Sequence, residues 1–172
     1  MSRDFNKDWR RKQEIKMRPI ADAIYKNVFG NDVIVERYEQ PDNKVLDIVF
    51  AIDVKLTFVN GQILTGQEKF LSHNYAKFRS ITVEHYQNPL VEELGDWFKL
   101  ASQIYFVGYC DATMGGFEPW VIADWTKVVT NTNDGNITWS NNTNSKDGAR
   151  ASFVYTKMDD LPNDCIIASS WT

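Results

Sequence analysis

A carboxylate, an amide and an amine flank the dipeptide Asn60-Gly61. Asn-Gly between two β-rich runs is the strongest short-range signal for a β-hairpin with a tight turn. Asp53 precedes this turn, and Gln67-Glu68-Lys69 follows it. Because side chains alternate between the two faces of a strand, the hairpin predicts Asp53, Gln67 and Lys69 on one face. The Glu68 side chain is then expected on the opposite face.

This trio of side chains suits a hard divalent cation that acts on a phosphodiester. Mg²⁺ takes oxygen ligands and is usually held by one or two carboxylates together with substrate phosphate. Asp53 is the expected anchor, with further oxygens from the Gln67 amide and the Glu68 main-chain carbonyl. Lys69 could orient or deprotonate an attacking water, or neutralise charge on the phosphate. The alternative is an ordinary cross-strand ion pair of Asp53 and Lys69 on a solvated sheet face, worth about 0.2–1 kcal/mol.

The elements that must position this face follow from the hydrophobic periodicity. Apolar residues at helical spacing predict a helix over residues 3–29, kinked or restarted at Pro19 and stopped by Gly30. A second helix, interrupted near Gly95 with Asp96 as a possible N-cap, is predicted over residues 89–103. Strands are predicted over residues 32–40, 48–59, 62–70, 80–86, 104–110, 120–125 and 151–158, the fourth in the same sheet as the hairpin, while residues 127–150 read as a polar loop or ragged hairpin. This order predicts a mixed α/β (α+β) fold.

The run AIDVKLTFVNGQILTGQEKF, behind an N-terminal helix, resembles the PD-(D/E)XK nuclease superfamily. It is most similar to small members encoded by phages and mobile elements, with an Asp in one strand and Q-x-K or E-x-K in the next. SITVEHYQN and GDWFKLASQIYFVGY extend the resemblance over residues 5–125. The resemblance implies an αβββαβ core with a mixed central sheet flanked by helices. It also implies DNA phosphodiester hydrolysis with Mg²⁺ or Mn²⁺, in which Asp53, Gln67 and Lys69 are catalytic and Asp53, Gln67 and Glu68 hold the metal.

The sequence departs from the family pattern at Gln67, where a charged Asp or Glu is usual. A neutral amide contributes a dipole and not a full charge, so it binds a cation more weakly. Asp47 could supply the missing charge only if the chain bends, because six residues of strand span nearly ~20 Å. The other candidates are Glu84 on the predicted strand 80–86 and an acid of the first helix. That helix offers Glu14 and Asp22.

The charge distribution singles out the N-terminus. The whole chain carries a formal charge of −4. Residues 1–18 hold seven basic and three acidic groups, so this arm carries +4 and the remainder −8. A basic arm on an acidic body favours phosphate contacts, and we expect Arg10, Arg11 and Lys12 to touch DNA. A solvated helix face is the alternative interpretation.

Length and composition set the remaining expectations. The 172 residues suit one nuclease-like domain over 1–172, with the basic arm at 1–18 and a β-rich C-terminal extension at 126–172. No apolar run is long enough to span a membrane, and no signal peptide, Walker loop or GxGxxG motif is recognised. Two cysteines are too few for a disulfide framework, which favours a cytoplasmic protein, for instance in a phage-infected bacterium. The sequence leaves open a homodimer, a catalytically inactive accessory protein of the same fold, and a β-rich structural protein in which the Q-E-K motif is fortuitous.

Overall fold

The chain builds two β-sheets, a long N-terminal helix and a short helix near the C-terminal third. This computed structural model describes residues 4–38, 46, 49–90, 92–143 and 151–171. A six-stranded sheet has the order β1-β2-β3-β6-β7-β10, and a four-stranded sheet has the order β5-β4-β9-β8. The larger sheet contains β1 (Ile34–Arg37), β2 (Val54–Thr57), β3 (Ile63–Leu71), β6 (Ile104–Cys110), β7 (Phe117–Asp124) and β10 (Ile166–Ser169). The smaller sheet contains β4 (Ser80–Asn88), β5 (Glu93–Leu94), β8 (Ser140–Thr143) and β9 (Ser152–Lys157).

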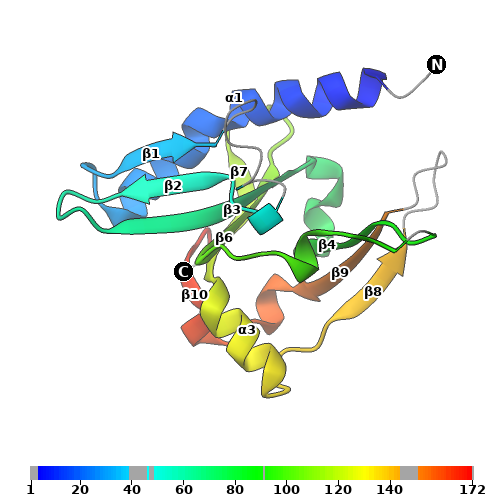
Figure 1. Ribbon diagram of the computed structural model, residues 1–172. Helices are drawn as coiled ribbons and strands as arrows, with labels where there is room; N and C mark the ends of the chain where they lie inside the picture. The colour runs from blue at the N-terminus through cyan, green and yellow to red at the C-terminus, as the bar shows by residue number, and fades with distance from the viewer. Residues whose placement is uncertain (1–3, 39–45, 47–48, 91, 144–150, 172) are drawn as a thin grey trace.

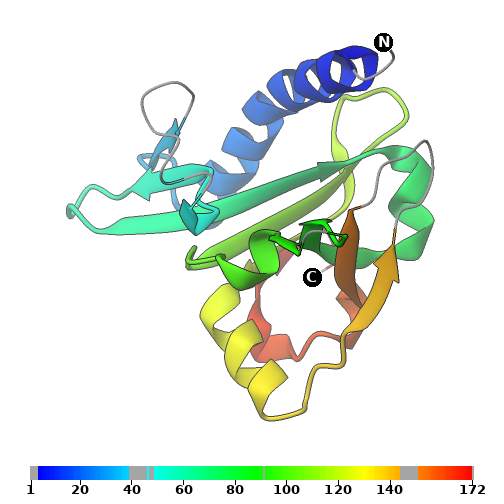
Figure 2. The same cartoon turned by 45° about the vertical axis from the view of Figure 1, so that its right-hand side comes forward.

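The larger sheet is covered on both faces. Helix α1 (Asp4–Phe29) lies across one face, while the smaller sheet and helix α3 (Trp125–Asn133) lie on the other side (Figure 1). Figure 2 shows the β2–β3 hairpin extending beyond the rest of the molecule at one end. Two apolar clusters hold these layers together. One lies beneath α1 and contains Val54, Leu56, Phe106 and Ile122; the other contains Val83, Tyr105, Val107 and Trp125.

Helix α1 confirms the helix predicted over residues 3–29, and Pro19 lies inside it. Met17, Ala21 and Tyr25 are fully buried. Their spacing of four residues places them on one stripe of the helix, which packs against the sheet. Gly30 follows the last helical residue with a φ of 110°, a left-handed conformation that favours glycine and ends the helix.

The predicted hairpin is confirmed. Strands β2 and β3 pair antiparallel, with Val54 opposite Gly66 and Thr57 opposite Ile63. Gly61 has a φ of 82°, which the turn requires. Strand β3 is longer than β2, and it pairs in parallel with β6 on its other side. The hairpin is therefore anchored to the centre of the sheet through β3.

The prediction of a second helix over residues 89–103 is wrong. In the described part of residues 89–103 the chain forms the short strand β5 and the 3₁₀ turn η2 (Asp96–Phe98). Gly95 explains the difference, because its N–H donates to His85 O at 2.9 Å and a Cβ there would lie 2.5 Å from Glu84 O. This close approach docks the segment onto β4. Strand β4 confirms the strand predicted over residues 80–86, but it belongs to the smaller sheet and not to the sheet of the hairpin.

The C-terminal third contains a helix that the loop prediction for residues 127–150 missed. Helix α3 begins after Asp124, whose carboxylate caps it by accepting from Lys127 N at 3.1 Å. Strand β9 confirms the predicted strand over 151–158, and the extension is otherwise built from β8, β10 and the 3₁₀ turns η4 (Met158–Asp160) and η5 (Asn163–Cys165). The architecture is thus a mixed α+β fold with a mixed central sheet. In the part of the chain that the structure describes, no helix is long and apolar enough to cross a membrane.

Candidate active site

Asp53 lies where β2 separates from β3. Its N–H donates to Gly66 O at 2.9 Å, and its carbonyl accepts from Tyr38 N at 3.0 Å. The β2–β3 register ends with Val54 opposite Gly66, and because Asp53 also bonds to Gly66, two residues of one strand oppose one residue of the other, as in a β-bulge. Ladder pairing ends here, and the Asp53 carboxylate takes over: its Oδ2 accepts from Glu68 N at 3.0 Å. A carboxylate is therefore held at the point where the two strands diverge.

Gln67 directly precedes Glu68 on β3. Its register with Tyr105 of β6 places it in the row of residues that faces the smaller sheet, since Tyr105 belongs to the core cluster on that side. Gln67 is only 7% exposed, and its side-chain oxygen Oε1 is buried without a hydrogen-bond partner among the described residues. A buried polar atom without a partner costs about 1–3 kcal/mol. The site therefore contains an amide oxygen whose burial the fold itself does not compensate.

Lys69 shares the face of Gln67, because it lies two residues further along β3 and is paired with Val107 of the same core cluster. Burial raises the pKa of the Glu84 carboxyl on β4, while the positive charge of Lys69 lowers it. Burial also raises the pKa of Tyr105 well above its ordinary value, and the charges of Asp96 and Asp53 add to this effect. The charges of Asp96, Asp53 and Glu84 therefore all act on the Tyr105 hydroxyl. The Tyr105 hydroxyl itself donates to Thr82 O at 2.8 Å.

The opposite face of β3 carries a closed ion network. Glu68 accepts two hydrogen bonds from Arg37, at 2.8 and 2.9 Å, and Arg37 also contacts the Asp22 carboxylate of α1 at 2.7 Å. The Arg37 and Glu68 side chains are 11% and 6% exposed. Asp22 is therefore committed to the face beneath α1 and does not join Asp53, Gln67 and Lys69.

The pKa values of this network reflect burial and mutual charge. Burial raises the pKa of the Glu68 carboxyl, and the Arg37 guanidinium opposes that rise. Burial would lower the pKa of Arg37, but its bonds to Glu68 and Asp22 outweigh this and raise it. Burial, reinforced by the Glu68 charge, raises the pKa of the nearby Tyr25 hydroxyl. The pair is thus geometrically complete, and its charges compensate each other.

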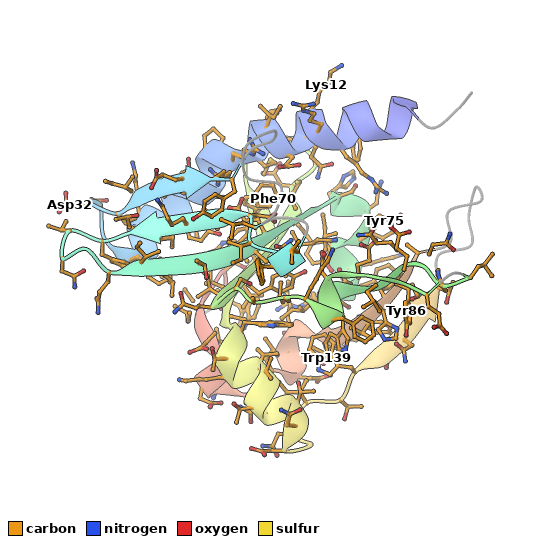
Figure 3. The ribbon with its side chains drawn as sticks, in the orientation of Figure 1. Lys12, Asp32, Phe70, Tyr75, Tyr86 and Trp139 are labelled. Carbon is orange, nitrogen blue, oxygen red and sulfur yellow. The ribbon has the colours of Figure 1, made fainter. Side chains whose placement is uncertain are left out.

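The remaining predicted residues are spread along α1 or lie outside the described chain. Glu14 is exposed and contacts Arg18, one helical turn away, at 2.7 Å. Arg10, Arg11 and Lys12 are exposed on α1, and Lys12 points away from the sheet (Figure 3). Asp47 falls outside the described residues. Glu84 is the secondary acid whose carboxyl pKa the Lys69 charge lowers.

The oxygen atoms near Asp53 are of the chemical type that a hard divalent cation prefers as ligands. The Asp53 carboxylate supplies one charge, and the buried Gln67 Oε1 needs a partner. In an extended strand the N–H and C=O of one residue point to the same side, so the Glu68 carbonyl also points toward the Asp53 side. Among the described residues, no group of three or more His, Cys, Asp or Glu side chains could hold a metal ion.

Several residues near this site were not predicted as site residues. Tyr105 was assigned to the core, which is confirmed by its 2% exposure, yet the charges described above act on its hydroxyl. Asp96 and Lys99, whose side chains contact at 3.5 Å, were placed on a helix that does not form. Arg37 bonds to Glu68, itself a predicted site residue, from 31 positions away in sequence, and no local pattern joins the two. A sharper signal was Asp96 beside Gly95, since glycine permits the close backbone approach that brings η2 to β4.

The case for this site rests on its geometry and on the sequence motif. Asp53 lies where the two strands diverge and its carboxylate accepts from Glu68 N, while Gln67 and Lys69 share one face of β3 and the Glu68 side chain pairs with Arg37 on the other. Both observations come from the chain itself. No protein-family model matches the sequence, and no curated protein or solved structure is significantly similar to it.

Proposed function

We propose that the protein is a metal-dependent nuclease of the PD-(D/E)XK type, which hydrolyses phosphodiester bonds of DNA. The observation that carries the proposal is the buried Gln67 oxygen, which lacks a hydrogen-bond partner among the described residues and lies next to Glu68, whose N–H holds the Asp53 carboxylate. Nature tolerates such an atom most readily where a ligand compensates it, because strained or unsatisfied groups concentrate at functional sites.

The topology around strand β3 also supports the proposal. A helix precedes three antiparallel strands, and β6 lies parallel to β3 on the far side of the meander. This agrees with the αβββ and final β of the expected core. The connection between β3 and β6 differs, because β4, β5 and two 3₁₀ turns replace the flanking helix.

The residues have separate tasks in this proposal. Asp53 is oriented by the Glu68 N–H and would bind Mg²⁺ or Mn²⁺ together with the Gln67 amide oxygen and the Glu68 carbonyl. The bound metal would activate water and neutralise charge on the phosphate. Lys69 would hold the attacking water or the phosphate oxygen, and its charge is available on the face that it shares with Gln67. Glu84 would tune Lys69 electrostatically, since the two groups influence each other.

The exposed basic stretch of α1 would contact DNA outside the cutting site. Arg10, Arg11 and Lys12 lie on the helix that covers the other face of the sheet. Phosphate contacts of this kind add affinity and make it salt-dependent without reading sequence.

A binding protein with the same fold and no catalysis is the second candidate. It is favoured by one observation, namely that the described residues contain no group of three or more potential metal ligands. Such a protein would bind DNA or a protein partner through the same surfaces and would leave phosphodiester bonds intact.

The test is cleavage of supercoiled, linear duplex, single-stranded and branched DNA in Mg²⁺ and in Mn²⁺. We expect Asp53→Ala to abolish cleavage and Lys69→Ala to lower the rate by about 10²–10⁴-fold while metal binding persists, because an ammonium is not a ligand. Gln67→Glu restores a charged ligand and should tighten Mn²⁺ binding. Lys55→Ala is the matched control, because Lys55 lies on the same hairpin and is paired with Glu36.

Two outcomes decide between the candidates. Loss of activity in the Asp53 and Lys69 variants but not in Lys55→Ala supports the nuclease. If the wild-type protein cuts none of the four substrates and calorimetry detects no bound metal, the catalytic proposal is wrong and the binding protein takes its place.

A further inference from the structure

A cavity of about 200 Å³ lies between η2 and α3, and three tryptophans line it. Its walls come from three segments that are far apart in sequence. The lining residues are Trp97, Leu100, Trp125, Val128, Val129, Thr132, Asn133 and Trp139. No acidic or basic side chain is among them, so the cavity is an apolar, aromatic recess with a small polar edge.

The aromatic wall is held in place by specific contacts. The Trp139 ring stands edge-on to Trp97, with centroids 4.9 Å apart, and edge-on to Trp125, at 6.2 Å. Trp139 Nε1 donates to Thr132 Oγ1 at 3.0 Å, and Thr132 Oγ1 donates to Val128 O at 2.7 Å. These bonds fix the indole against α3. Figure 3 shows Trp139 between α3 and the smaller sheet.

The cavity adjoins the candidate active site. Trp97 directly follows Asp96 in η2, and the Trp125 ring packs edge-on against Tyr105 at 5.1 Å. Tyr105 lies beside Gln67 on the neighbouring strand, and Asp53 lies one strand further. Adjacent strands are about 5 Å apart. The recess is therefore separated from Asp53 by Trp125, Tyr105 and Gln67, which adjoin one another in that order.

The size and chemistry of the cavity select its occupant. Pockets for drug-sized molecules measure roughly 300–1,000 Å³, so this smaller recess suits a single planar ring system. Aromatic walls stack on nucleobases of any sequence. Asn133 is exposed at the edge, and no hydrogen bond to another described residue engages its side-chain amide. Such an amide can both donate to and accept from the edge of a base.

We propose that this tryptophan-lined cavity holds one unpaired nucleobase beside the cutting site, which makes single-stranded or locally unpaired DNA the substrate. The inference rests on the proposed function for its partner, a nucleic acid, but not on catalysis. A base paired within a duplex cannot enter a closed aromatic recess without leaving the stack. The cavity thus selects strands whose bases are already free.

The test is binding without cleavage, in EDTA, followed by fluorescence anisotropy of a labelled oligonucleotide. We expect the wild-type protein to bind the single strand more tightly than the matching duplex. Trp97→Ala removes one stacking wall and should weaken single-strand binding roughly 5- to 100-fold. Val129→Gln crowds the mouth from an exposed position and should weaken it without removing a core side chain, and Asn133→Ala should cause a smaller loss.

Two controls separate base recognition from phosphate contacts and from misfolding. Trp171→Ala removes a tryptophan that packs on Arg79, away from the cavity lining, and should leave binding unchanged. A strand made entirely of abasic nucleotides keeps its phosphates but should bind wild type as weakly as it binds Trp97→Ala. Circular dichroism of each variant checks the fold.

The outcomes for the cavity and for the nuclease are distinct. Base-dependent binding without cleavage in Mn²⁺ would support the proposal for the cavity and contradict the proposal that the protein is a nuclease. Cleavage by a protein whose Val129→Gln variant binds single strands normally would leave the nuclease standing and overturn the cavity proposal. Equal affinity for normal and abasic strands, or no single-strand binding by wild type, would also overturn it.

Discussion

The two faces of strand β3 differ in whether the buried polar side chain of the strand has a hydrogen-bond partner. Beneath α1, Glu68 is paired through two hydrogen bonds with Arg37, which in turn contacts Asp22. On the other face, one residue earlier, Gln67 is buried to a similar extent and its Oε1 has no partner among the described residues. Adjacent positions of one strand thus carry a carboxylate that is paired through two hydrogen bonds and an amide oxygen that has no partner.

The difference teaches which of the two faces is structural. A carboxylate and a guanidinium that satisfy each other are stable without any ligand, and they fix α1, β1 and β3 relative to one another. An amide oxygen without a partner destabilises the fold, and a ligand that contacted this oxygen would remove the cost. The Glu68 main-chain N–H links the two faces, because it holds the Asp53 carboxylate at 3.0 Å while its side chain holds Arg37.

The largest expected effect comes from breaking the ion pair between Arg37 and Glu68. Arg37→Ala would leave the buried Glu68 carboxylate without its guanidinium and should lower the free energy of unfolding by about 3–5 kcal/mol, measured by urea denaturation. Replacing both partners, Arg37→Met with Glu68→Leu, should recover most of this loss, because no buried charge remains. Asp159→Ala breaks the exposed pair with Arg79 and should cost less than about 1 kcal/mol.

A loss below about 1 kcal/mol for Arg37→Ala would show that the network is not the structural anchor described here. The double variant separates the effect of an unpaired charge from the effect of lost side-chain packing. If it were as unstable as Arg37→Ala, the loss would come from packing of the side-chain stems and not from an unpaired charge.

The face that carries Gln67 should respond in the opposite direction. Gln67→Met replaces the amide with an apolar side chain of similar length and removes the unpaired oxygen. It should raise the free energy of unfolding by about 1–3 kcal/mol and abolish any metal-dependent cleavage, which is the trade-off expected at a functional site. Gln87→Met, on the exposed part of β4, should change stability by less than about 0.5 kcal/mol. A destabilised Gln67→Met protein would mean that the amide is already satisfied in solution.

The sequence was sufficient to predict that Glu68 faces away from Gln67 and Lys69, because this orientation depends on local rules. Asn60-Gly61 set the turn, the register followed from it, and the two-residue period of a strand separated Glu68 from Gln67 and Lys69. Helix α1 was equally predictable, since Ile20, Ile24 and Val28 recur at helical spacing. The mixed α+β class followed from the order of these elements.

The second sheet could not be predicted from such rules. SITVEHY has the alternation of a strand, but alternation does not say which sheet a strand joins. PLVEELGDWFKLASQ has helical composition, yet Gly95 is held against the β4 backbone by a contact that only a three-dimensional neighbour provides. The bond between Arg37 and Glu68 also joins distant residues. The coupling of Glu84 to Lys69 depends on how the two sheets pack.

The smallest expected effect concerns Glu84 and pH. Burial raises the pKa of its carboxyl in the folded protein, so the folded state binds the proton more tightly than the unfolded state does. Stability contributed by this group therefore falls as pH rises from the ordinary glutamate pKa, near ~4.3, through the raised value, and the cost stays in full above it. Glu84→Gln should be more stable than wild type at pH 7, by less than about 1 kcal/mol because the side chain is half-buried. The gain should fade as pH falls to about 4.

Asp159→Asn provides a control of opposite sign, because Arg79 lowers the pKa of Asp159 and the variant should lose stability at pH 7 but not in acid. Removing Lys69 should enlarge the gain from Glu84→Gln, because the Lys69 charge is what partly offsets the burial of Glu84. Thermal unfolding of the single and double variants across this pH range measures each change in stability. An unchanged gain in the Lys69→Met background would show that Glu84 is not coupled to Lys69.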